Sequence, residues 1–418
     1  MKAARFALII ALLVLTVPGF GRRCACAEES GQTVIMDMDT ARHQPLPFGQ
    51  DKTPAGTVEV VDGKFGKACK FTFAAGAQGG FFSARVAATP EWDTAAGISF
   101  WVKGDGSASW GGLEMIDGDD FSARYAYCFP IDSAEWRKIT IPWCDLLPEH
   151  AQAKFVGAKD GYPPSKFRNL WFGKWWYWRE YPAHSFTIDR IALEREIPVD
   201  ATDYTPPAPG LPRLLAKLKA RKPVTIVTMG DSLSDKRHWA NRQVLWSELL
   251  AAELKKTFGS EVRLVNVALG GTELRANLVL MPRWLKETPE PDLVTVWFGY
   301  NDWSSGMRGP AFRETLRVAV DRLRRLTRGR SEVLLITSCP SMERWDTMEE
   351  FAEAARAVAA ERKTGLADVA AAFHERGLLV DARPTLYCDD KTHLGGPGHL
   401  LACQTVLKAI ADGPDRKR

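Results

Sequence analysis

The sequence lacks any long apolar run beyond its first residues and, once those residues are set aside, any excess of charge. Its 418 residues include 55 Lys and Arg and 51 Asp and Glu, for a formal net charge of +4. Four of the cations, Lys2, Arg5, Arg22 and Arg23, lie in residues 1–27, which contain no acidic residue. The rest of the chain is electrically balanced, which argues against nucleic acid or an anionic membrane as a partner.

Residues 1–27 have the pattern of a secretory signal peptide. Lys2 and Arg5 precede an apolar stretch at 6–17, and Ala-Cys-Ala at 25–27 has the small residues of a cleavage site. The apolar stretch is too short to span a bilayer comfortably. We therefore expect cleavage before Glu28, no membrane span in the mature chain, and a bacterial protein that is secreted or periplasmic.

Cysteine is sparse and never spaced C-x-x-C, so structural zinc is not expected. An H-E-x-x-H pair, a P-loop and a G-x-G-x-x-G after a strand are also missing, so the sequence predicts no catalytic metal and no required cofactor. Beyond the signal peptide each half of the chain has three cysteines. Two alternatives are therefore equally open: the cysteines are buried free thiols, or each half forms one disulfide and keeps one free cysteine. These cysteines are Cys69, Cys128, Cys144, Cys339, Cys388 and Cys403.

The chain divides into parts of different character. Short β-rich runs punctuated by Gly, Asp and Pro fill residues 28–196 and predict an all-β, jelly-roll-like sandwich; they lie at 58–61, 69–73, 97–102, 136–141 and 185–193. Proline is concentrated in residues 197–222, which we interpret as a linker with a short helix at 214–220.

Residues 223–418 alternate buried-type strands with amphipathic helices. This alternation predicts a three-layer α/β/α domain around a parallel sheet. Strands are expected at 224–229, 262–267, 293–298 and 333–337, and helices at 244–258, 311–328, 348–363 and after Pro397.

Polar and glycine residues follow three of these strands. Ser232 lies in Gly-Asp-Ser-Leu after the first, Gly271 follows the second, and Asn301 lies in Gly-Tyr-Asn-Asp after the third. Because the carboxyl ends of parallel strands form one rim, these residues should converge there, and the loop before the last helix could add Asp390 and His393. Such a set can activate a serine through an imidazole held by a carboxylate, with two N–H groups and an amide for the oxyanion.

The four blocks together resemble the SGNH (GDSL) hydrolases over about residues 223–412. The resemblance implies that Ser232 is the nucleophile, His393 the general base and Asp390 its orienting carboxylate, with Asp389 as a rival. Ser232, Gly271 and Asn301 would form the oxyanion hole, although Gly270 could donate in place of Gly271. No G-x-S-x-G elbow is present, which argues against the α/β-hydrolase fold.

The aromatic-rich first half loosely resembles the carbohydrate-binding modules found beside secreted glycan-acting enzymes. Trp175, Trp176 and Trp178 cannot all point inward along a strand, so part of this cluster is expected to be exposed and to stack on sugar rings. Near the serine, His238 is a further candidate for binding substrate. Structural calcium in this half, held by Asp37, Asp39 and Asp189, is a weaker hypothesis.

Together these features predict a secreted serine esterase that removes acyl groups, with acetyl expected, from a polysaccharide or oligosaccharide. Two enzymatic alternatives stay open, a glycan O-acyltransferase and a lipolytic GDSL esterase. A third alternative is a non-catalytic glycan-binding protein, against which the complete set of Ser232, Asn301, Asp390 and His393 argues.

Overall fold

The structure, a computed structural model, describes residues 31–45, 56–76, 80–118, 123–157, 160–174, 182–379 and 382–412. The expected signal peptide and Trp175, Trp176 and Trp178 lie outside these ranges. In the described part of the chain, no helix combines the length and apolar character needed to cross a bilayer.

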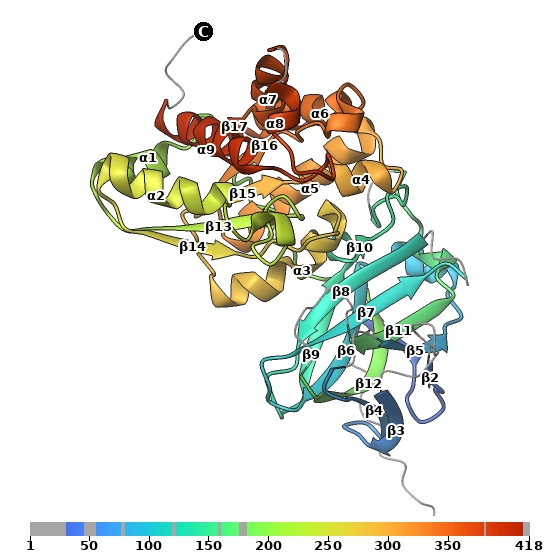
Figure 1. Cartoon of the computed structure of the whole chain (residues 1–418). Coiled ribbons are helices and arrows are strands. Elements are labelled where there is room, and N and C mark those ends of the chain that lie inside the picture. Colours follow the sequence, from blue (N-terminus) through green and yellow to red (C-terminus); the bar gives the residue numbers. More distant parts are fainter. Residues whose placement is uncertain are drawn as a thin grey trace, which may run out of the picture. The chain divides into compact units, whose positions relative to one another are not determined.

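The first half folds into two antiparallel sheets, as predicted (Figure 1). One sheet has the order β3-β4-β12-β6-β9 with β1 beside β12, and the other has the order β10-β8-β7-β11-β5-β2. The strands of the first are β1 (Gln32–Met36), β3 (Gly56–Asp62), β4 (Lys67–Phe73), β6 (Gly97–Gly104), β9 (Arg137–Pro142) and β12 (His184–Glu194). Those of the second are β2 (Gln44–Pro45), β5 (Gly80–Arg85), β7 (Trp110–Ile116), β8 (Arg124–Pro130), β10 (Leu147–Pro148) and β11 (Asn169–Lys174).

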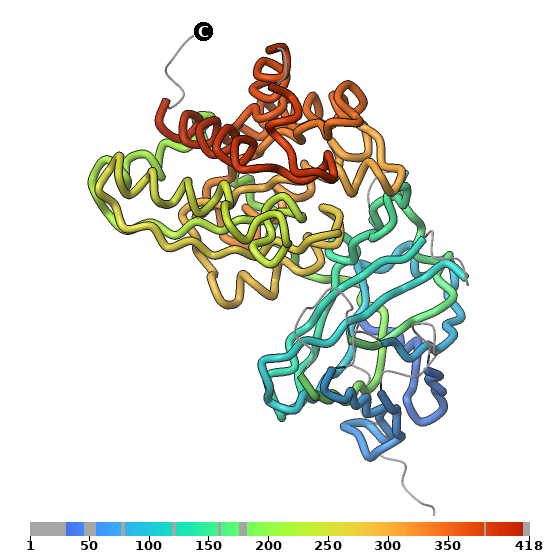
Figure 2. Tube along the Cα trace, viewed as in Figure 1, coloured from blue at the N-terminus to red at the C-terminus, as the bar shows by residue number. Residues whose placement is uncertain are grey.

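Phenylalanine side chains from both sheets fill the space between them. The ring of Phe71 on β4 lies 5.8 Å from that of Phe172 on β11, and Phe100 on β6 lies 5.1 Å from Phe129 on β8, measured between centroids. Successive side chains of a strand point to opposite faces, so each sheet can direct one set of rings inward. In Figure 2, β12 returns late in the chain to lie between β4 and β6 and so completes the first sheet.

The second half is built on a five-stranded parallel sheet of order β14-β13-β15-β16-β17 (Figure 1). Its strands are β13 (Val224–Gly230), β14 (Val262–Asn266), β15 (Leu293–Trp297), β16 (Glu332–Ile336) and β17 (Gly365–Ala367). The helices are α1 (Pro212–Lys219), α2 (Trp246–Phe258), α3 (Leu274–Glu287), α4 (Tyr300–Ser304), α5 (Gly309–Leu326), α6 (Glu349–Arg362), α7 (Val369–Gly377), α8 (Ala382–Thr385) and α9 (Gly396–Ala411).

The two faces of the parallel sheet pack against different helices, which gives the predicted α/β/α layers. Val227 and Val294 point to the face covered by α3, α5 and α6, whereas Ile226 and Leu293 point to the face covered by α1, α2, α7 and α9. Figure 2 shows α9 running beside α2 on that second face. Strands buried on both faces are almost continuously apolar, which is why their sequences were easy to recognise.

Helix α3 also packs against the β-sandwich. Leu278 and Met281 of α3 belong to the same buried cluster as Trp110 and Cys128 of the second antiparallel sheet. The thiol of Cys128 donates a hydrogen bond to the carbonyl oxygen of Val279 at 3.0 Å. The sandwich and the α/β half therefore share one hydrophobic core through α3.

All six cysteines of the described chain are free thiols, which decides the alternative that the sequence left open. Four of them, Cys69, Cys128, Cys339 and Cys403, are buried. Burial raises the pKa of the Cys128 thiol to about 12, so it stays protonated and serves as a small hydrogen-bond donor in the shared core.

Candidate active site

Ser232 lies in a tight turn at the carboxyl end of the inner strand β13. The turn is held by Asp231, whose buried carboxylate accepts a hydrogen bond from the backbone N–H of Leu233 at 3.0 Å. The amide of Asn241 donates to the carbonyl oxygen of Ser232 at 2.6 Å. Both contacts fix the backbone at Ser232, a residue that is itself partly exposed at the carboxyl ends of the strands.

The structure brings together the three side chains predicted for catalysis. Nε2 of His393 lies 2.8 Å from Oγ of Ser232, although the two residues are 161 positions apart. Nδ1 of the same ring lies 2.5 Å from the Oδ2 of Asp390. The serine, imidazole and carboxylate thus form one continuous hydrogen-bonded chain, and the carboxylate in it is that of Asp390 rather than Asp389.

The backbone of the loop that carries His393 holds the carboxylate of Asp390 in place. Oδ1 of Asp390 accepts hydrogen bonds from the backbone N–H groups of Thr392 at 3.1 Å and His393 at 3.0 Å. Partial burial raises the pKa of Asp390, but these hydrogen bonds and the one from the His393 ring outweigh it and leave the pKa below its usual value. Asp390 therefore stays ionised and can hold a proton on Nδ1 of His393.

Two adjacent glycines follow β14, and they have different environments. The N–H of Gly270 donates to the Oδ2 of Asp235 at 2.9 Å, so it is already used. Gly271 has φ +77°, in the region that favours glycine, and a Cβ there would face open space. Within the described ranges no residue accepts a hydrogen bond from the N–H of Gly271, which leaves that donor for a ligand.

Asn301 occupies the first turn of α4, directly after β15. Its side-chain amide donates to the carbonyl oxygen of Thr272 at 3.0 Å, which links it to the residue after Gly271. A side-chain amide has two N–H groups, so one remains for another acceptor. The contact joins the second and third sequence blocks into one wall of the site.

Asp302, next to Asn301, is fully buried and braces the same wall. Its Oδ1 accepts a hydrogen bond from the backbone N–H of Leu274 at 3.0 Å, while its Oδ2 has no partner among the described residues. Burial, helped by the nearby charges of Glu273 and Asp231, raises the pKa of Asp302 to about 8. The carboxyl group is therefore protonated at neutral pH.

This raised pKa makes stability depend on pH. The folded protein keeps the Asp302 proton up to about pH 8, whereas an unfolded aspartate loses it near pH 4. The native state thus binds the extra proton between these values, and the free energy of unfolding falls as pH rises, by at most about 1.4 kcal/mol per pH unit.

We expect Asp302→Asn to flatten this decline, because asparagine retains the acceptor for Leu274 but does not titrate. Urea unfolding at several pH values between about 5 and 8 measures the effect. The variant should gain stability relative to the wild type as pH rises. Parallel stability curves for the two proteins would show that Asp302 is ionised in the fold.

His238 lies against the catalytic imidazole. Its ring stacks on that of His393 with centroids 4.0 Å apart and planes at 27°, and its Nδ1 accepts a hydrogen bond from the N–H of Ala240. The neighbouring Trp239 meets the His393 ring edge-on at 5.9 Å and is 53% exposed. The sequence had singled out His238 for substrate binding; the structure places it beside His393 and adds an exposed indole at the mouth of the site.

Several residues that shape the site were missed in the sequence. Asp235 is buried and ties the Ser232 turn to the Gly270 loop, and Asn241 holds the carbonyl of Ser232. Both residues follow the serine within ten positions, and this closeness was the only sign in the sequence that they shape the site. Asp and Asn are common in turns, so their type alone does not distinguish a brace from an ordinary turn residue.

The acidic residues considered for calcium have backbone partners. Asp189 accepts hydrogen bonds from the N–H groups of Lys64 and Phe65 at 2.7 and 2.9 Å, and Asp39 accepts one from Lys67 at 2.6 Å. Over the described ranges, no group of three His, Cys, Asp or Glu side chains is arranged to hold a metal ion. The calcium site stays a prediction.

Comparison with known families assigns both halves of the chain. Residues 228–401 match the GDSL-like lipase/acylhydrolase family, and residues 29–152 match a carbohydrate-binding domain of family 11. No curated protein matches the chain.

Solved structures similar to the chain each cover somewhat less than half of it. One is the lipase/acylhydrolase from Enterococcus faecalis, with 21% identity and a TM-score of 0.38, covering 46% of this chain and 100% of that one. Another is Axe2, an acetylxylan esterase from Geobacillus stearothermophilus, with 21% identity and a TM-score of 0.39, covering 48% of this chain and 100% of that one.

The family matches agree with the fold and with the four sequence blocks, all of which lie within residues 228–401. The hydrogen-bonded serine, imidazole and carboxylate are also able to hydrolyse a carboxylic ester. The chain therefore contains a GDSL-like lipase/acylhydrolase domain over residues 228–401 and a carbohydrate-binding domain of family 11 over residues 29–152, and the protein is a carboxylic ester hydrolase.

Proposed function

We propose that this protein is an exported serine esterase that removes acetyl groups from a polysaccharide or its fragments through an acyl-enzyme on Ser232. The observation that carries the proposal is the chain of contacts from Oγ of Ser232 to Nε2 of His393 at 2.8 Å and from Nδ1 to Asp390 at 2.5 Å. Export rests on the sequence of residues 1–27.

In the first half-reaction, Nε2 of His393 takes the proton of Ser232 as Oγ forms a bond to the carbonyl carbon of the ester. Asp390 keeps the other imidazole proton on Nδ1 and stabilises the positive charge that develops on the ring. His393 then gives the proton from Nε2 to the leaving sugar oxygen as its bond to the carbonyl carbon breaks. The acyl group remains on Ser232.

The second half-reaction repeats these steps with water. Nε2 of His393 takes a proton from water as the water oxygen attacks the acyl carbon, and then returns a proton to Oγ of Ser232 as acetate leaves. In both half-reactions the backbone N–H groups of Ser232 and Gly271 and the amide of Asn301 would stabilise the oxyanion. Each such donor contributes about 2.7–4 kcal/mol to lowering the barrier.

Two features support a glycan as the substrate. The family-11 match places a carbohydrate-binding domain in the same chain as the esterase. At the site itself, the half-exposed Trp239 offers an indole face within 5.9 Å of the His393 ring, where the apolar C–H face of a sugar could stack. A sugar held there would have its acyl group close to Ser232.

The test is acetate release from a panel of acetylated polysaccharides, with the Ser232→Ala protein as the blank. We expect release from at least one polysaccharide and a preference for acetate over long-chain p-nitrophenyl esters. Added unacetylated glycan should not accept the acetyl group in place of water. A preference for long acyl chains without acetate release would instead make the protein lipolytic, and acetylated acceptor would make it an acyltransferase.

A further inference from the structure

The imidazole of His393 has a second imidazole lying against its face. The ring of His238 is stacked on it with centroids 4.0 Å apart and planes at 27°. His238 belongs to the segment that directly follows Ser232, whereas His393 lies 161 positions beyond that serine in the sequence. The segment that carries the nucleophile therefore also supplies a surface against which the distant base is placed.

The two hydrogen bonds of His393 do not by themselves fix the plane of its ring. Both are made by ring nitrogens, Nε2 at 2.8 Å from Oγ of Ser232 and Nδ1 at 2.5 Å from Oδ2 of Asp390. A rotation about the line through the two nitrogens leaves both of them in place. Such a rotation still turns the lone pair of Nε2 away from Oγ, and proton transfer depends on that alignment.

The stacked ring of His238 opposes this rotation. Whichever way the His393 ring turns about the line through its nitrogens, one of its edges moves toward His238, and at 4.0 Å between centroids the two rings are already in contact. Trp239 meets the His393 ring edge-on at 5.9 Å, and the His393 side chain is only 17% exposed. The imidazole is therefore held by residues 238–239 as well as by its hydrogen bonds.

His238 is itself fixed by the turn that holds Ser232. Its backbone N–H donates to the carbonyl oxygen of Asp235 at 3.0 Å, and its own carbonyl oxygen accepts from the N–H of Asn241 at 3.1 Å. Its Nδ1 accepts the N–H of Ala240 at 3.4 Å and so caps the short 3₁₀ turn that follows. Because the amide of Asn241 also holds the carbonyl of Ser232, one brace positions both the nucleophile and the stacked ring.

We propose that His238 is a positioning residue, whose ring keeps the imidazole of His393 in the plane required for proton transfer to and from Ser232. It acts through His393 rather than on the substrate, which differs from the substrate binding that its place in the sequence suggested. The inference rests on the part of the proposed function in which His393 is the base. Because alignment of the base matters during the reaction itself, the ring should affect kcat rather than KM.

Two features of His238 can be separated by substitution. Its ring contacts His393, and its Nδ1 accepts the N–H of Ala240. Asparagine keeps a side-chain acceptor suited to a cap but has no ring, whereas phenylalanine keeps an aromatic ring but has no acceptor. His238→Asn therefore tests the ring, and His238→Phe tests the cap.

His238→Asn should lower kcat for p-nitrophenyl acetate by about 10- to 100-fold, the range expected when a catalytic group is misplaced by up to about 1 Å. KM and Tm should stay close to their wild-type values. His238→Phe should show the opposite pattern, with most of the wild-type kcat but a lower Tm, because the N–H of Ala240 loses its acceptor. Steady-state kinetics and thermal unfolding measure both effects, and His238→Ser, which also caps without a ring, replaces His238→Asn should that variant not fold.

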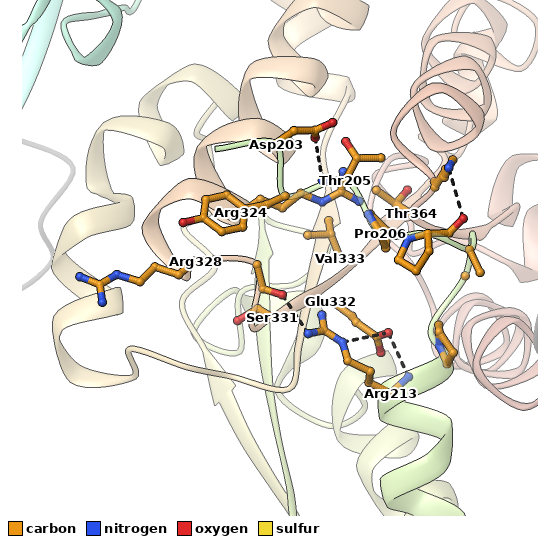
Figure 3. Close-up of a pocket in the computed structure, with 17 residues that line it drawn as sticks. Asp203, Thr205, Pro206, Arg213, Arg324, Arg328, Ser331, Glu332, Val333 and Thr364 are labelled. Carbon is orange, nitrogen blue, oxygen red and sulfur yellow. Dashed lines mark hydrogen bonds and ion pairs between the residues drawn. The ribbon is translucent and has the colours of Figure 1, made fainter. Parts of the chain in front are cut away.

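His374→Asn is the matched control. His374, on α7, is also a half-buried histidine with an aromatic neighbour, since its ring meets that of Trp345 edge-on at 5.1 Å. A second control comes from the cavity of about 360 Å³ in Figure 3, which lies at the amino ends of β16 and β17 and is bordered by the exposed Arg328. Both His374→Asn and Arg328→Gln should keep the wild-type kcat.

His393→Ala in the same assay separates this proposal from the assignment of the base. Turnover retained by His393→Ala would overturn both. Loss of turnover in His393→Ala together with a wild-type kcat in His238→Asn would overturn the positioning role alone. That role is also overturned when His238→Phe loses as much kcat as His238→Asn, because the cap and not the ring would then be responsible.

Discussion

Ser232→Ala is expected to abolish hydrolysis of p-nitrophenyl acetate, with kcat falling by at least about 10⁴-fold. The methyl side chain cannot form the bond to the acyl carbon, and the imidazole of His393, 2.8 Å from Oγ in the wild type, loses the proton donor it acts on. The oxyanion donors would remain, which accounts for any residual rate. Steady-state kinetics measures the loss.

Folding should be unaffected, because the Ser232 side chain is partly exposed and the turn is held by Asp231 and Asn241 through backbone atoms. Unchanged thermal unfolding confirms that the loss is chemical. Ser133→Ala, in an exposed turn of the sandwich, is the matched control and should keep the wild-type rate. Full turnover by Ser232→Ala would rule out the acyl-enzyme on this residue.

Arg275→Ala should lower the free energy of unfolding by about 3–6 kcal/mol, the combined worth of two hydrogen bonds to a charged donor. Arg275, in the first turn of α3, is 1% exposed, and its Nη1 donates to the carbonyl oxygens of His150 and Ala153 in the β-sandwich. Its Nε donates to Thr315 at 3.2 Å. Alanine would leave buried carbonyl groups without donors where the two halves meet.

Urea unfolding measures this loss against Arg313→Ala as the control. Arg313 makes an exposed ion pair with Glu361, and such pairs contribute about 0–1 kcal/mol. An equal effect of the two variants would show that the sandwich contributes little to the stability of the α/β half. A larger loss of stability in Arg275→Ala than in Arg313→Ala would instead show that the carbohydrate-binding domain unfolds together with the half that carries the active site.

The strands of the α/β half could be predicted because each buried parallel strand is a short apolar run followed by a polar residue or glycine. The strand predicted at 224–229 is β13 (Val224–Gly230), and that at 293–298 is β15 (Leu293–Trp297). The edge strand β17 (Gly365–Ala367) was not predicted, because three residues are too few to show a pattern. It is a strand only because it pairs with β16.

Helix α3 was not predicted, and the reason lies in its surroundings. Its residues 274–281 are all buried, including the polar Arg275 and Asn277, and Pro282 within it normally interrupts a helix. The helix packs on the parallel sheet on one side and on the sandwich on the other. Only the joining of the two halves gives both sides an apolar partner.

Among the candidate residues, local sequence left two choices open that the backbone decides. Gly270 and Gly271 are adjacent and chemically identical, and they differ because Asp235 takes the N–H of Gly270. Asp389 and Asp390 differ because the turn directs the Asp390 carboxylate to the ring of His393. The two members of each pair are the same type of residue, so the sequence cannot tell them apart. They differ only in the hydrogen bonds that the folded backbone lets each one make.

By itself the sequence determined the two-part architecture, the positions of the main parallel strands along the chain and the identity of the serine, asparagine and histidine that meet at one rim. It could do so because parallel strands bring their carboxyl ends together whatever the length of chain between them. The tertiary structure alone decided that the carbohydrate-binding domain shares a core with the esterase and that Trp239 stands beside the catalytic histidine. These features arise from contacts between distant segments, which leave no periodic signal in either segment.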